Sequence, residues 1–157
     1  MQKVIMALAG VLIAAMPVSA QIQKQYKMEK QVFNPWKWQD QRSYVQAVEV
    51  KNVTGTLYCA GQAAVNADGT SSTADMRTQL LQAIDNLETV IKTAGYDCKN
   101  IVRLNIYTTS SAELLPIFFE IFKPWVEKHG MQQAVTLMEV KSLFETLKVE
   151  LEATVVK

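Results

Sequence analysis

An apolar stripe between residues 76 and 94 is the feature that most constrains the fold. Its members are Met76, Leu80, Ile84, Leu87, Ile91 and Ala94. Spacings of three and four residues place them on one face of an α-helix. We expect this helix to run from about 74 to 94, with a capping box of Ser72 and Asp75 before it and Gly95 as its C-terminal cap. Because only one face is apolar, the helix must pack against a second layer.

The segments on either side of this helix have the patterns of β-strands. Their β-branched and aromatic residues, often in alternation, predict strands at 31–33, 44–51, 56–60, 101–108, 134–140 and 147–156. Pro35 should end the first strand, because proline cannot donate to a β-ladder. A second helix is predicted from Ser111 to His129, with Gly130 as its stop and a kink or break at Pro124.

This order of elements predicts an α/β (α+β) fold, with a mixed six-stranded sheet and two helices on one face. In the last strand, alternate residues are apolar, and Lys148, Glu150 and Glu152 share the opposite face. The face of the sheet away from the helices must meet water or another subunit. Since Val48 and Val50 are expected on that face, we predict a homo-oligomer.

The first twenty residues have the pattern of a secretory signal peptide. Lys3 precedes the uncharged run 4–16, and the small-residue segment 17–20 follows. The run is shorter than the roughly 20 residues that a membrane-spanning helix needs. We therefore expect cleavage of 1–20 and export to the periplasm or the exterior. We also expect a disordered segment at 21–30 and a single domain at 31–157.

The charge balance of the chain argues against polyanionic partners. Without Lys3, the 16 lysines and arginines become 15 and equal the 15 aspartates and glutamates. A formally neutral domain lacks the surplus of positive charge that nucleic acids and anionic membranes attract. We therefore expect neither nucleic acid nor membrane as a partner.

The histidine and cysteine content excludes several kinds of chemistry. His129 is the only histidine, and its place beside Gly130 favours a role at a helix end over catalysis. One histidine with the distant Cys59 and Cys98 does not suggest a zinc site, and no glycine-rich phosphate loop precedes either helix. We expect no metal and no cofactor. A disulfide is an alternative in an oxidising compartment, but we favour two separate thiols, with Cys59 buried in a strand.

Glu150 and Glu152 are the first candidates for chemistry. They are two residues apart on one strand, so their carboxylates point to the same side. If they are partly buried at a subunit interface, either could have a raised pKa and act as a general acid or base. The alternative is a solvated strand face on which Lys148 is their ion-pair partner.

Several short segments match a known pattern in their order and spacing. Residues 44–47 (Tyr-Val-Gln-Ala) are similar to Tyr-Ser-Gln-Ala, and residues 60–62 (Ala-Gly-Gln) to Ser-Gly-Gln. Further similarities lie at Gly69, Gln79, Asn86-Leu87, Ala94-Gly95, Asn100 to Arg103 and 148–153. Over most of 44–155, the chain thus resembles the reactive-intermediate deaminase (RidA/YjgF) family.

The resemblance implies a mixed sheet backed by two helices, assembled as a homotrimer with small-molecule clefts between the subunits. Known members hydrolyse reactive enamines and imines to ketones and ammonia. In them an arginine binds the substrate carboxylate, and a glutamate positions or activates water. Carried onto this chain, the glutamate is Glu150 and a cleft tyrosine is Tyr44.

Three polar cleft positions of the family are apolar in this chain. The arginine position is Val135, an asparagine position is Phe118, and the serine before Gly-Gln is Ala60. Valine cannot bind a carboxylate, and each charge-assisted hydrogen bond lost removes about 1.5–3 kcal/mol. A cleft lined by Phe118, Val135 and Leu137 suits a neutral or aromatic ligand better than an anionic one.

Two functions remain open at this point. The first is a diverged hydrolase that acts on a less polar enamine or imine, with Glu150 positioning water. The second is a non-catalytic trimer that binds an apolar ligand or a protein in the same clefts, and a shared fold does not decide between them. Arg42 offers a replacement guanidinium near Tyr44, although an arginine in a loop is normally solvated.

Overall fold

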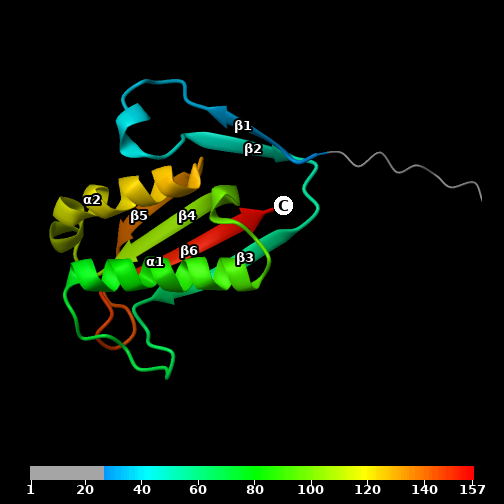
Figure 1. The fold of residues 1–157 in the computed structure, drawn as a ribbon. Helices are drawn as coiled ribbons and strands as arrows, with labels where there is room; N and C mark the ends of the chain where they lie inside the picture. Colours follow the sequence, from blue (N-terminus) through cyan, green and yellow to red (C-terminus); the bar gives the residue numbers. More distant parts are fainter. Residues whose placement is uncertain (1–26) are drawn as a thin grey trace, which may run out of the picture.

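The computed structural model describes residues 27–157, and the predicted signal peptide lies outside them (Figure 1). In chain order, the elements are β1 (Glu29–Phe33), the 3-10 turn η1 (Asp40–Arg42), β2 (Ala47–Lys51), β3 (Thr56–Ala63), α1 (Met76–Thr93), the 3-10 turn η2 (Cys98–Asn100), β4 (Ile101–Thr108), α2 (Ser111–His129), β5 (Ala134–Glu139) and β6 (Val149–Val156). The prediction of disorder up to residue 30 is wrong at its end, because Glu29 and Lys30 pair with Lys51 and Val50 of β2.

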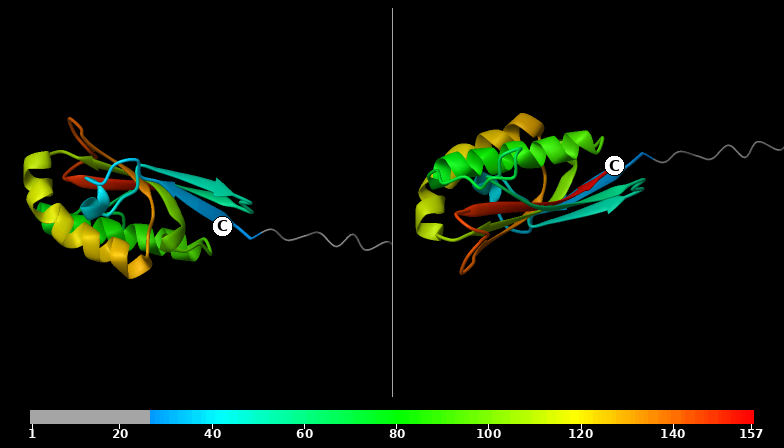
Figure 2. Two further views of the ribbon diagram at one scale, coloured as in Figure 1. Left: turned by 90° about the horizontal axis from the view of Figure 1, so that it is seen from above. Right: turned by 90° about the horizontal axis from the view of Figure 1, so that it is seen from below.

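Four strands form the main sheet, in the order β3-β6-β4-β5. β6 is antiparallel to both β3 and β4, and β4 is parallel to β5. β3 and β4 therefore run in the same direction, so α1 and α2 each connect strands of the same direction. Because such crossovers are right-handed, both helices come to lie on one face of the sheet. Figures 1 and 2 show this two-layer arrangement, which confirms the predicted fold class.

The described residues 27–157 contain six strands, but these do not form the single sheet that we predicted. β1 and β2 form a separate antiparallel pair. One isolated bridge, between Val45 and Ala134, connects this pair to β5. The next backbone N–H, that of Gln46, donates to Asn34 Oδ1 at 2.9 Å. The strand predicted at 44–51 is shorter in the structure, where β2 begins at Ala47.

The helix α1 forms where the apolar stripe predicts it. The five stripe residues within it, from Met76 to Ile91, are at most 5 % exposed and pack in the core between the helices and the sheet. Its N-cap is Asp75, which accepts from the Thr78 N–H at 2.8 Å, so the predicted capping box of Ser72 and Asp75 is wrong. Gly95 has a φ of +74°, as expected of a residue that ends a helix.

The helix α2 has the predicted bounds, and Gly130 follows it with a φ of +62°. Pro124 does not divide the helix, which also contains Pro116. Figure 2 shows instead that the axis bends between its first and last turns, the usual effect of proline inside a helix. No helix within residues 27–157 combines the length and the apolar composition of a membrane span.

Candidate functional site

Glu150 lies on β6, between β3 and β4, where it pairs with Ala63 on one side and Tyr107 on the other. Its side chain rests on Gly61 of β3, where an added Cβ would be only 1.7 Å from Glu150 Oε1. The β3–β6 ladder is irregular between Cys59 and Gln62, around this glycine. A position without a side chain is therefore what leaves room for the carboxylate.

The Glu150 side chain borders an open hollow of about 560 Å³ at the free edge of β3. The turn after β3, the face of α1 and the segment before β6 form its walls. Asn86 of α1 holds the turn in place by donating to the carbonyls of Ala63 (2.8 Å) and Val65 (2.9 Å). Of the described residues that line the hollow, only Glu150 is ionisable, so it is the group that can move a proton there.

The two neighbouring carboxylates on β6 have different surroundings. Glu152 accepts the hydroxyl of Tyr107 at 2.7 Å and the amide of Asn105 at 3.4 Å. The hydrogen bond to Glu152 is the main reason why the pKa of Tyr107 is raised. The Glu150 carboxylate accepts no hydrogen bond from any residue within 27–157. Both of its oxygens are therefore available to water or to a ligand, whereas Glu152 Oε2 already accepts from Tyr107 and Asn105.

The predicted alternative for Glu150, an ion pair with Lys148, is not what the structure shows. Lys148 extends to Glu113 of α2, with 3.0 Å between Nζ and Oε2. Arg103 is on the same face of the sheet as Glu152, but it donates to Asn105 Oδ1 and Thr136 Oγ1, each at 3.0 Å. In the described part of the chain, no cation pairs with Glu150.

The other predicted site residues fall into two groups. Ala60 is exposed and precedes Gly61, which contacts Glu150, so Ala60 and Glu150 form the first group. Val135 and Leu137 lie on β5, at the opposite edge of the sheet, with their side chains towards the helix layer. Tyr44 is close to this second edge, since its neighbour Val45 bridges to β5. A single chain thus carries two halves of the predicted site on opposite sheet edges.

Phe118 is not a lining residue of either group. It is 4 % exposed and stacks on Phe122 in the core, with ring centroids 4.6 Å apart. The prediction that Phe118 lines a cleft is therefore wrong for this chain. The helix instead exposes the next aromatic residue, Phe119, which is 46 % accessible.

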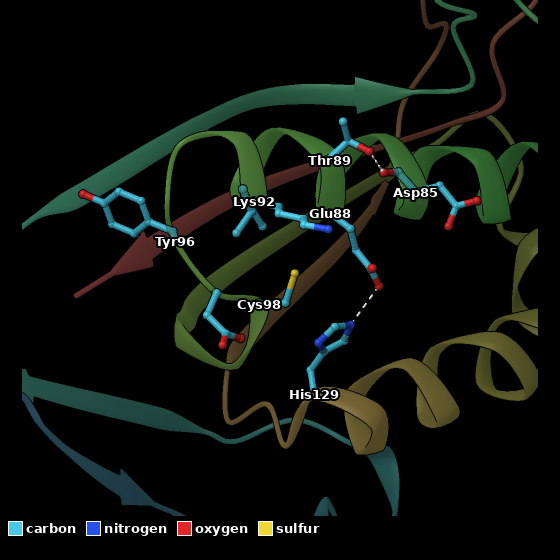
Figure 3. A pocket seen from close by; sticks show the side chains of 9 residues that line it. Asp85, Glu88, Thr89, Lys92, Tyr96, Cys98 and His129 are labelled. Carbon is cyan, nitrogen blue, oxygen red and sulfur yellow. Dashed lines mark hydrogen bonds and ion pairs between the residues drawn. The ribbon is translucent and has the colours of Figure 1, made fainter.

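A second hollow, of about 500 Å³, lies on the helix side between α1, η2 and the end of α2 (Figure 3). Glu88 of α1 accepts from Trp125 Nε1 (2.8 Å) and Lys128 Nζ (3.2 Å), and its Oε1 is 2.8 Å from His129 Nε2. Burial raises the pKa of Glu88, but the bonds from His129, Lys128 and Trp125 outweigh burial and lower it. His129 lies in the last turn of α2, as predicted, but its ring contacts Glu88 of α1.

The cysteines are two free, buried thiols, as we predicted. Cys98 borders the helix-side hollow, where burial, reinforced by the charges of Glu88 and Asp97, raises its pKa to about 11. Burial also raises the pKa of Cys59. Both are therefore protonated and poor nucleophiles at neutral pH. Residues 27–157 contain no cluster of three or more histidine, cysteine or acidic side chains able to hold a metal ion.

Comparison with known proteins places the chain in a family. Residues 38–157 match the family described as endoribonuclease L-PSP. The chain belongs to this family. A RutC family protein of Aquifex aeolicus is 29% identical over 114 residues, which cover 73% of this chain and 88% of the relative. The 2-iminobutanoate/2-iminopropanoate deaminase of Escherichia coli is 28% identical over 116 residues, which cover 73% and 87%.

A solved structure leads to the same conclusion. The Rid family protein YyfB from Yersinia pestis superposes with a TM-score of 0.73 at 28% identity, over 82% of this chain and 98% of that one. The predicted membership of the RidA/YjgF family is thereby confirmed.

We did not predict from the sequence that Trp125, Lys128 and His129 bind Glu88. We also did not predict that Gly61 leaves room for the Glu150 side chain. A signal for the first was present, because Trp125, Lys128 and His129 are spaced three and four residues apart and so share one face of α2. No local signal could have shown that this face meets Glu88.

Proposed function

We propose that this family member hydrolyses a small enamine or imine of low charge, with Glu150 positioning the attacking water. The observation that carries the proposal is the unengaged Glu150 carboxylate, held over Gly61 at the mouth of an otherwise non-ionisable hollow. The name of the Escherichia coli relative, an imine deaminase, supports the type of reaction.

The chemistry requires one proton acceptor beside a bound water. The Glu150 carboxylate takes a proton from water as the water oxygen bonds to the C=N carbon, and it passes this proton to the substrate nitrogen to give the neutral carbinolamine. The carboxylate then moves the proton of the carbinolamine hydroxyl to the nitrogen as the C–N bond breaks. The carbonyl product and ammonia leave, and the carboxylate is again unprotonated. An enamine enters the same route after protonation at carbon gives the imine.

We propose a homotrimer in which each cleft combines the two sheet edges of neighbouring copies. The separation of Glu150 and Ala60 from Tyr44, Val135 and Leu137 supports this assembly, because no single chain can join them. The residues of the β5 edge would then provide an apolar wall opposite Glu150. Such a wall favours a neutral or aromatic substrate over a carboxylate.

A glutamine substitution at position 150 tests the proposal. Glu150→Gln keeps the size of the side chain but removes the base. The rate of hydrolysis of an imine that the wild type hydrolyses should therefore fall by about 10²–10⁴-fold. Glu152→Gln is the matched control on the same strand face, and we expect it to change the rate by less than about tenfold, because this carboxylate is not the proposed base. The loss of imine absorbance would be followed for a panel of neutral, aromatic and carboxylate-bearing imines. Equal rates for wild type and Glu150→Gln on every hydrolysed substrate would refute the enzymatic proposal.

The second candidate is a non-catalytic protein that binds an apolar ligand in the same clefts. It is supported by the apolar residues at positions 60 and 135. Saturable binding of a neutral aromatic compound without any hydrolysis by the wild type would favour it. We do not propose ribonuclease activity, because the single histidine is bound to Glu88 on the helix side. The signal-peptide pattern at 1–20 supports action in the periplasm or the exterior.

A further inference from the structure

A third hollow lies between the segment that connects β1 to β2 and the helix α2. It measures about 560 Å³ and is lined by Trp38, Gln41, Arg42, Leu115 and Phe119. It shares no lining residue with the Glu150 hollow. In Figure 1, the connecting segment is drawn in cyan.

The walls of this hollow are unusually apolar for a surface. Trp38 is 53 % exposed, and Leu115 and Phe119 are 47 % and 46 % exposed. Trp36, itself 57 % exposed, stacks on Trp38 with centroids 6.3 Å apart. A contiguous exposed group of large apolar side chains generally marks a binding surface.

Arg42 is the only ionisable side chain among the described residues that line the hollow. Its guanidinium carbon is 5.2 Å from the centroid of the Trp38 ring. A cation over a ring leaves the N–H donors of the guanidinium able to bind an anion. Among the side chains that the structure describes, which do not include that of Asp40, no carboxylate pairs with these donors. The hollow therefore combines flat apolar walls with one guanidinium that lacks an anion.

We propose that this hollow binds a small organic anion with a flat apolar body, such as an aromatic carboxylate. The carboxylate accepts the edge donors of Arg42 in the bidentate geometry that guanidinium favours. The ring lies against Trp38 and Phe119, and the volume of the hollow is within the usual range for small-molecule sites. This site goes beyond the proposed hydrolysis, because it does not use Glu150.

Calorimetric titration with 2-naphthoate tests the proposal, with 2-naphthamide as the neutral compound of the same shape. We expect saturable binding of about one naphthoate per chain. Arg42→Gln should weaken naphthoate binding by about tenfold or more and leave naphthamide binding unchanged, because it removes charge-assisted hydrogen bonds and little apolar surface. Lys37→Gln is the matched control, since it removes a charge from the same connection at a residue that does not line the hollow. It should leave both affinities unchanged.

Several results would overturn the proposal. These are the absence of saturable naphthoate binding, equal affinity for naphthoate and naphthamide, and equal effects of Arg42→Gln and Lys37→Gln. Sedimentation velocity of Trp38→Leu provides a further test, because a smaller assembly would show that the surface is covered by a second copy of the chain. Glu150→Gln should bind naphthoate as the wild type does, so failure of the hydrolase proposal can be told apart from failure of this one.

Discussion

Replacing Gly61 by alanine should separate the activity of this protein from its stability. An ideal Cβ at this position would be 1.7 Å from Oε1, 2.4 Å from Cδ and 2.8 Å from Cγ of Glu150. Ordinary contacts between heavy atoms are about 3.5–4.0 Å, so the carboxylate must move by roughly 2 Å. The backbone itself tolerates alanine, because Gly61 is not among the residues with positive φ.

The expected change in the free energy of unfolding is small. Forcing Glu150 off its preferred rotamer costs about 0.5–1.5 kcal/mol. The lower conformational entropy of the unfolded alanine chain offsets about 0.4–1 kcal/mol of this cost. Urea unfolding should therefore show a net change of less than about 1 kcal/mol. In contrast, a catalytic group misplaced by about 1 Å can cost 10²-fold in rate, so imine hydrolysis should fall at least this far.

Gly55→Ala is the matched control for this experiment. Its Cβ would meet the end of another side chain, the hydroxyl of Tyr96, at 2.6 Å. We expect a similarly small effect on unfolding and no effect on hydrolysis. A Gly61→Ala protein with a wild-type rate would refute the reasoning, as would one that is destabilised by more than about 3 kcal/mol, because the clash would then not be confined to Glu150.

Three further predictions concern other parts of the molecule. Val135→Arg should raise the preference for carboxylate-bearing over neutral imines by about tenfold or more in competition assays, and an unchanged preference would place position 135 outside the cleft. The lowered pKa of Glu88 stabilises the fold above the ordinary carboxyl pKa, and this contribution is lost as the pH falls through the lowered value. Urea unfolding of Glu88→Gln should therefore show a deficit of about 1 kcal/mol at pH 7 that shrinks as the pH falls below the ordinary carboxyl pKa, and a deficit that does not change with falling pH would contradict the assignment. Cys59 and Cys98 should react with a thiol-specific reagent only after unfolding, since both are buried with raised pKa values, and rapid labelling of the native protein would disprove this.

Much of the candidate site could be predicted because its signals are local. Alternation along the last strand placed Glu150 and Glu152 on one face, and the structure agrees. The difference between them depends on β4, whose Tyr107 hydroxyl bonds to Glu152. The alternation pattern of one strand cannot specify which residue of another strand donates to it.

Phe118 shows the same limit within a helix. Phe118 and Phe119 are adjacent aromatic residues in an apolar stretch, so composition does not distinguish the inner from the outer one. The direction in which α2 packs against the sheet buries Phe118 and exposes Phe119. Similarly, β1 and β2 form a separate pair, and the contact of Asn34 with the Gln46 N–H joins residues twelve positions apart.

The sequence by itself determined the helices, the strands and their apolar faces, because periodicity and caps act over one or two turns or a few strand residues. It also determined the family, through motifs in a fixed order. Only the tertiary structure decided that Glu150 is unengaged over Gly61, that the predicted cleft residues occupy opposite sheet edges, and that Arg42 lies against Trp38 beside α2. These arrangements depend on contacts between segments far apart in the chain, whose geometry is set by the packing of the whole domain.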